Sequence, residues 1–160
     1  MATKIVIVGL EKSGKSTIAN FLAKHESALS LDEYVPTEIV RIMSFSVPMR
    51  TGQLKVSLWD SNDTNEHLLP GFSRDCEGLI IVFDPSRPEE SYTKYLNAFQ
   101  HLDRKCVVVM VHKREEDTIQ IMLPGELQRF QNLTTSLNND EEKQNIHNLF
   151  MRLVQGVVES

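Results

Sequence analysis

Apolar residues along the chain follow two periods, which predict strands and helices in alternation. Short runs rich in Val, Ile and Leu have the length and composition of strands, and a run without polar positions is typical of a strand covered on both faces. The strand-like segments are 4–8, 39–47, 54–60, 78–84, 106–111 and 130–135. We interpret Arg50-Thr51-Gly52-Gln53 as the turn of a hairpin between the second and third of these segments.

Helical spacing of apolar residues appears in 15–24, in 91–102 and after a capping residue at Asn139 or Asp140. The last of these helices has the clearest apolar stripe, formed by Ile146, Leu149, Phe150, Leu153, Val154 and Val157. Residues 61–76 show no clean period and predict a loop with a short helix. The alternation indicates an α/β fold, namely a mostly parallel six-stranded sheet with one antiparallel edge strand, flanked by helices.

Length and charge limit the classes of function. A chain of 160 residues can bury one core, so we expect a single domain over 1–160. The formal net charge of -5 argues against a nucleic-acid partner, because such partners are held by basic surfaces. Cys76 and Cys106 lack metal-ligand spacing, and we expect them to be buried thiols in a reducing compartment.

The chain shows no sign of a direct membrane anchor. No apolar run reaches membrane-spanning length, and a strand-like segment follows the first residues too closely to leave room for a signal peptide. Ala2 excludes myristoylation, and the last residues contain no cysteine for prenylation. We therefore expect any membrane association to depend on another protein.

Residues 9–16 read Gly-Leu-Glu-Lys-Ser-Gly-Lys-Ser and match the P-loop pattern, in which a strand leads through a glycine-rich loop into a helix. Backbone N–H groups of such a loop point inward and bind phosphate, and the start of the helix adds positive potential. Lys15 can reach the outer two phosphates of a nucleotide, and the Ser16 hydroxyl can bind Mg²⁺. The predicted phosphate-binding residues in this stretch are Glu11, Lys12, Ser13, Gly14, Lys15, Ser16 and Thr17.

Two further polar groups are expected near this loop. Ligands of parallel sheets bind outside the carboxyl ends of the strands, where the loop, Asp60 and the segment after Val111 all lie. The hydroxyl of Thr37, in an extended and exposed segment 32–37, and the Asp60 carboxylate are groups that a magnesium phosphate site needs. We therefore predict Ser16, Thr37 and Asp60 as the Mg²⁺ residues.

The order of these features resembles the Ras-like small GTPases, Rab and Arf types included, over nearly the whole chain. The resemblance implies a P-loop small GTPase (G domain) fold that binds GTP or GDP with Mg²⁺. It also implies that Thr37 closes over Mg²⁺ and the terminal phosphate, and that Asp60 holds Mg²⁺ through water.

The chain departs from this family at the positions that act in GTP hydrolysis. After Asp60 the family carries a glycine and usually a glutamine, at positions occupied here by Asp63 and Thr64. Asp63 brings a negative charge towards the γ-phosphate that it faces, and Thr64 is too short to orient the attacking water. We assign no catalytic residue and expect GTP binding with weak or absent GTPase activity, which leaves open whether the protein is an enzyme.

Guanine recognition is also altered. The family motif of Asn or Thr, Lys, any residue and Asp corresponds here to 112–115, in which His112, Lys113 and Glu115 are the predicted base-binding residues. Lys113 can lie along the base, and Glu115 can accept from the guanine N–H donors if the backbone makes room. A weaker contact costs about tenfold to a hundredfold in affinity. The family also has a turn that lies beneath the base, and the matching residues here are Ser136 and Leu137. Of the contacts that this turn makes with the base, only the backbone contact would remain.

The specific departures resemble the Rab-like GTPase subunits of the intraflagellar transport B complex. They include Glu-Tyr-Val-Pro-Thr at 33–37, the Leu-Trp-Asp strand end, the Val-His-Lys turn and a missing fourth helix. The resemblance implies a cytoplasmic protein of the cilium or flagellum and its base, bound to coiled-coil subunits of that complex. It suggests a nucleotide-binding interaction module.

Two alternatives stay open. The chain can be an active GTP/GDP switch whose missing groups come from an activating partner, or a P-loop kinase that uses ATP, although few arginines are available for a kinase lid. For partner contacts we consider apolar side chains of the hairpin and of the loop after it, namely Met43, Phe45, Val47, Met49, Leu68, Leu69 and Phe72.

Overall fold

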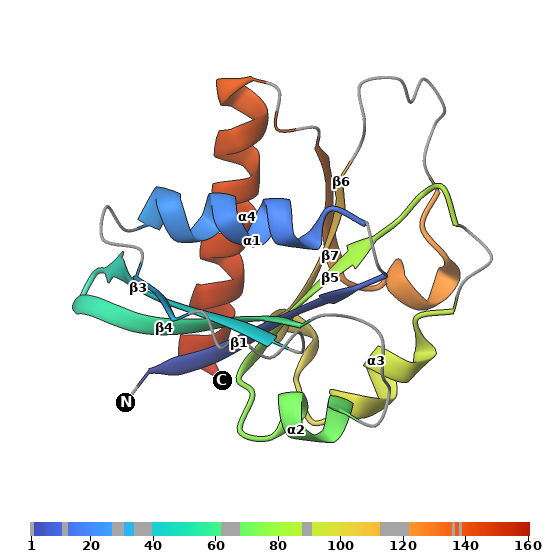
Figure 1. Cartoon of the computed structure of the whole chain (residues 1–160), viewed down its shortest axis with the longest axis horizontal. Helices are drawn as coiled ribbons and strands as arrows, with labels where there is room; N and C mark the ends of the chain where they lie inside the picture. Colours follow the sequence, from blue (N-terminus) through green and yellow to red (C-terminus); the bar gives the residue numbers. More distant parts are fainter. Residues whose placement is uncertain are drawn as a thin grey trace.

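One sheet organises the computed structural model, which describes residues 2–10, 13–26, 31–33, 40–61, 68–87, 91–112, 122–135, 137 and 139–160. Within this part of the chain the strand order is β2-β3-β4-β1-β5-β6-β7 (Figure 1). The strands are β1 (Thr3–Gly9), β2 (Leu31–Glu33), β3 (Val40–Met49), β4 (Gly52–Ser61), β5 (Gly78–Phe83), β6 (Val107–His112) and β7 (Gln131–Thr135). β3 runs antiparallel to β2 and β4, and all other neighbours are parallel.

The predicted α/β class with one antiparallel strand is confirmed, and all six predicted strands are present. The count and the edge position need correction, because β2 adds a seventh strand outside β3. This strand has three residues, too few to show a period in the sequence. Residues 34–39, which complete the predicted extended segment, lie outside the described residues.

The hairpin between β3 and β4 is tighter than predicted. Met49 pairs with Gly52, so that Arg50 and Thr51 alone connect the strands. Gly52 has a φ of +134°, a conformation that L side chains rarely adopt. The two-residue turn fixes the register of both strands, and this register places Arg41 directly opposite Asp60.

Helices of unequal length cover the two faces of the sheet (Figure 1). α1 (Lys15–Glu26) and α4 (Asp140–Glu159) lie on one face, whereas α2 (Leu69–Ser73), α3 (Thr93–Ala98) and the 3₁₀ turn η3 (Gly125–Leu127) lie on the other. A second 3₁₀ turn, η2 (Arg104–Cys106), precedes β6. The predicted cap of α4 is confirmed at Asn139, whose side chain accepts a hydrogen bond from Glu142 N at 2.9 Å. α3 is shorter than the predicted 91–102.

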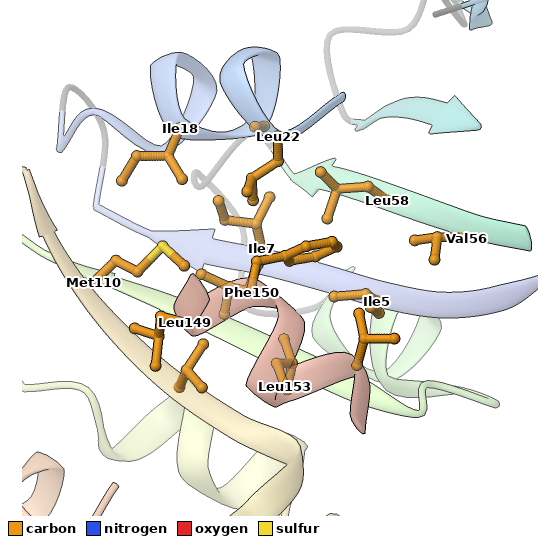
Figure 2. Close-up of a cluster of buried hydrophobic side chains, with 14 of the residues drawn as sticks. Ile5, Ile7, Ile18, Leu22, Val56, Leu58, Met110, Leu149, Phe150 and Leu153 are labelled. Atoms are coloured by element: carbon orange, nitrogen blue, oxygen red, sulfur yellow. The ribbon is translucent and has the colours of Figure 1, made fainter. Parts of the chain in front are cut away.

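Two apolar clusters fill the space between the sheet and these helices. Figure 2 shows the cluster under α1 and α4, in which Ile18 and Leu22 of α1 meet Phe150 of α4 over β1. All six predicted stripe residues of α4 are buried. Cys76 and Cys106 are buried and free, as predicted for core thiols, and burial raises the pKa of Cys76 to about 11.

Most of the apolar side chains considered for partner contacts belong to the core, as some of them must. Met43, Phe45, Val47, Leu69 and Phe72 are at most 7% exposed. The first three are buried because alternate residues of β3 face α1 and α4, whereas Leu69 and Phe72 of α2 belong to the cluster on the other face of the sheet. Met49 and Leu68 are partly buried against the same clusters. Among the described helices, none has the length and hydropathy needed to cross a membrane.

Candidate nucleotide-binding site

The glycine-rich loop connects β1 to α1 in the order that the motif predicts. β1 ends at Gly9 and α1 begins at Lys15. Ser13 N donates to Leu10 O at 3.1 Å, and Ile18 N donates to Gly14 O at 3.0 Å to open the helix. Gly14 has a φ of +96°, the left-handed conformation that turns the backbone towards the centre of the loop.

Glycine is required at both ends of the loop by close packing. A Cβ atom at Gly9 would lie 2.7 Å from Val82 O of β5, and one at Gly14 would lie 2.8 Å from the side chain of His112. The loop is therefore pressed against the carboxyl ends of β5 and β6. This contact confirms that the loop and the end of the strand that carries Val111 meet in space.

The lysine of the motif lies along the loop. Lys15 is 6% exposed, and its Nζ donates to Gly9 O at 3.1 Å. Ser13 is also buried, and its hydroxyl has no hydrogen-bond partner among the described residues. A buried donor without a partner is costly, so this hydroxyl is suited to a phosphate oxygen. Thr17 is exposed at the first turn of α1, and Glu11 and Lys12 lie outside the described residues.

Ser16 and Asp60 meet beneath the loop. Ser16 Oγ donates to Asp60 Oδ2 at 2.8 Å, although 44 residues separate the two in sequence. Asp60 is 6% exposed, and its Oδ1 has no partner among the described residues. Burial raises the pKa of Asp60, while the Ser16 hydrogen bond and the charges of Arg41 and Lys15 act in the opposite direction.

These oxygen atoms fit Mg²⁺. Magnesium is usually held by one or two protein oxygens together with water and phosphate, and a buried carboxylate oxygen without a partner is a natural acceptor for a metal-bound water. Ser16 and Asp60 would hold the ion, which would neutralise phosphate charge when bound. Thr37, the third predicted residue, lies outside the described residues.

Arg41 and Asn20 also belong to the site, and the sequence pattern does not predict either of them. The Arg41 guanidinium lies 3.4 Å from Asp60 Oδ2, and it also donates to Asn20 Oδ1 on α1. The hairpin turn is the sequence signal that could have found Arg41, because a two-residue turn at Arg50 and Thr51 places Arg41 opposite Asp60. The longer turn predicted from the sequence implies a different register.

The base side of the site is described in part. His112 ends β6, is partly buried and lies over Gly14. Leu137 has a φ of +61°, and its N–H donates to Thr135 Oγ1 at 3.4 Å. Lys113, Glu115 and Ser136 lie outside the described residues, so their contacts with the base stay predictions.

Asp63 and Thr64, the residues at the positions linked to hydrolysis, also lie outside the described residues. The described part of the site offers groups that suit a phosphate and a cation. Backbone amides of the loop, the Lys15 ammonium and the Ser16–Asp60 pair can together hold a di- or triphosphate with a divalent cation. The geometry supports nucleotide binding.

The chain is similar to known proteins. Intraflagellar transport protein 22 of Chlamydomonas reinhardtii is 28% identical over 121 residues, which cover 71% of this chain and 63% of that protein. Its homolog in Xenopus tropicalis is 28% identical, and the match covers 98% of this chain and 90% of that protein. The chain thus spans less than two thirds of the Chlamydomonas protein and most of the Xenopus protein.

A solved structure described as "T. brucei IFT22/74/81 GTP-bound crystal structure" has the same fold. Its TM-score is 0.67 at 24% identity, and the match covers 99% of this chain and 95% of that chain. The family model "Ras of Complex, Roc, domain of DAPkinase" matches residues 4–116 of this chain. The Ras-like resemblance is therefore confirmed, and the chain belongs to the Roc family of Ras-like GTPase domains.

Proposed function

We propose that this chain is an atypical GTP- or GDP-binding subunit of an intraflagellar transport B complex, in which it acts as a nucleotide-binding interaction module. The observation that carries the proposal is the Ser16–Asp60 contact of 2.8 Å beneath a P-loop whose lysine is already buried. A chance match to the motif would not bring a carboxylate from β4 to this hydroxyl.

The proposal includes Mg²⁺ at Ser16 and Asp60, with Thr37 as the third residue. It includes weak or absent hydrolysis, because Asp63 and Thr64 replace the glycine and glutamine of the Ras-like pattern. It also includes a preference for guanine weakened by Glu115. Membership of the Roc family favours a guanine nucleotide over the ATP of a kinase.

The names of the relatives support a partner and a place in the cell for this proposal. Similar proteins are named Intraflagellar transport protein 22, and the similar solved structure contains IFT22 together with 74 and 81. We infer that this chain binds the corresponding subunits, with coiled-coil segments as the contact, in the cytoplasm and in the cilium or flagellum. No nucleic acid and no direct membrane anchor is part of the proposal.

Binding is tested by the nucleotide that the purified protein carries, identified by chromatography after denaturation, and by titration with fluorescent GDP. We expect bound guanine nucleotide, and a loss of affinity of about a hundredfold or more in Lys15→Ala. Lys143→Ala is the matched control, because Lys143 is exposed on α4. An empty protein that ignores GDP and GTP with Mg²⁺ would falsify the proposal.

The alternative function is an active switch that needs a partner in trans. The Ras-like pattern places Asp63 opposite the γ-phosphate, where its charge would reduce the difference between the two nucleotides, so we expect GDP and GTP to bind within about tenfold of each other. We also expect the same affinity for the partner subunits in both states. A strong dependence of partner binding on GTP, with hydrolysis accelerated by a partner, favours the switch.

A further inference from the structure

Arg41 brings a fixed positive charge to the predicted cation site. The hairpin register sets it directly across from Asp60 on the neighbouring strand. Its Nη2 lies 3.4 Å from the same carboxylate oxygen, Oδ2, that accepts from Ser16. The guanidinium therefore shares an oxygen with the hydroxyl that is expected to bind Mg²⁺.

The arginine is held in this position from a second side. The same Nη2 atom donates to Asn20 Oδ1 on α1, so both a helix and a strand fix its orientation. The side chain is 24% exposed, and its Nε is buried without a partner in the described part of the chain. Asp60 is its ion-pair partner among the described residues.

Two protein cations thus act on one buried carboxylate. Lys15 and Arg41 both lie close enough to Asp60 to influence its charge. In a P-loop site the lysine and Mg²⁺ neutralise the phosphates. A third positive group near the ion repels it, and the carboxylate that attracts the ion is already partly neutralised.

We propose that Arg41 is an internal counter-ion at the cation position, which weakens the binding of Mg²⁺ and makes nucleotide binding unusually tolerant of its removal. This inference rests on the proposed function, because it concerns the same nucleotide site. Arg41 is a positioning residue for Asp60 and does not need to touch the nucleotide. It supplies part of the positive charge that the metal supplies elsewhere in such sites.

The test compares the dissociation constant for fluorescent GDP in millimolar Mg²⁺ and in excess EDTA. In the unmodified protein we expect the two values to differ by less than about tenfold. In Arg41→Gln we expect a ratio at least about tenfold larger, because the metal site gains affinity while binding without metal weakens. Arg41→Lys keeps the charge and should keep a ratio close to that of the unmodified protein.

Arg50→Gln is the matched control, since it removes the same charge from the exposed turn of the same hairpin. Thermal melting establishes that each variant is folded, and Arg41→Met replaces Arg41→Gln if the latter is not. Equal ratios in the unmodified protein and the neutral variants overturn the inference, as does a strong Mg²⁺ dependence before any substitution. Failure of every variant to bind nucleotide in both buffers overturns the proposed function instead.

Discussion

Asp60 and Asp84 occupy similar places but have different surroundings. Asp60 lies at the carboxyl end of β4, Asp84 directly follows β5, and each is 6% exposed. The Asp84 carboxylate accepts from Ser86 N at 2.9 Å, Ser86 Oγ at 2.6 Å and Arg87 Nε at 2.9 Å, with Arg87 Nη2 at 2.8 Å. The Asp60 carboxylate accepts from Ser16 Oγ at 2.8 Å and lies 3.4 Å from Arg41 Nη2.

The pKa values of the two carboxyls move in opposite directions as a result. Burial raises the pKa of Asp60, and its few partners do not compensate. Burial acts on Asp84 in the same direction, but the hydrogen bonds from Ser86 and Arg87 outweigh it and lower the pKa. Asp84 is satisfied within the protein, whereas Asp60 is left for a ligand.

The first expected difference between the two is in nucleotide binding. Asp60→Asn should weaken fluorescent GDP binding in Mg²⁺ by up to about tenfold, because the contact of the carboxylate with the cation is lost. Asp84→Asn should leave the affinity unchanged. Titrations of both variants in the same buffer test this contrast, and an equal loss in both would break it.

Stability should respond in the opposite sense. Asp84→Ala removes the acceptor for Ser86 and Arg87 and should lower the free energy of unfolding by about 2–3 kcal/mol. Asp60→Asn removes a poorly compensated buried charge and should raise the stability of the nucleotide-free protein by up to about 1 kcal/mol. Urea unfolding near neutral pH measures both. A large destabilisation by Asp60→Asn would show that its carboxylate is structural.

The pH dependence of unfolding gives a third comparison. The lowered pKa of Asp84 stabilises the fold above the ordinary aspartate pKa of about 3.9, and this contribution is lost as the pH falls through the folded value. Asp84→Asn should therefore flatten the acid limb of the stability curve. The raised pKa of Asp60 has the reverse sign, so the gain in Asp60→Asn should vanish below about pH 4. Unfolding between acid and neutral pH measures both slopes.

The smallest effect concerns the two arginines. Arg87 contacts Asp84 through both Nε and Nη2, and lysine cannot reproduce this pair of bonds. Arg87→Lys should cost about 1 kcal/mol of stability. Arg41→Lys should cost less, because the Arg41 contact with Asp60 is longer. Equal losses in both variants would mean that the Arg41 contact is stronger than its distance indicates.

The sequence alone predicted the elements whose signal is local. The glycine-rich motif located the loop, and the apolar stripe with Asn139 located α4, because both depend on residues within a few turns of each other. Ser16 and Asp60 were placed together by the rule that ligands bind at the carboxyl ends of parallel strands. Both aspartates end apolar strands, so the sequence pattern itself did not separate the roles of Asp60 and Asp84.

Features that depend on register were not predicted. The predicted hairpin turn is two residues too long, and this error concealed the pairing of Arg41 with Asp60. The burial of Met43, Phe45 and Val47 was not predicted either, because packing decides which side of β3 faces α1 and α4. β2 pairs through three residues, which carry no period of their own.

The two faces of the sheet differ in how easily their covering helices detach. The face covered by α1, which follows the P-loop, and by α4 has helices of 12 and 20 residues. The opposite face is covered by α2 and α3, which have 5 and 6 residues. Short helices lose few contacts when they detach, so amide hydrogen exchange begins on the α2 and α3 side. The α2 and α3 face can therefore open locally while the face that carries α1 keeps the phosphate-binding loop folded.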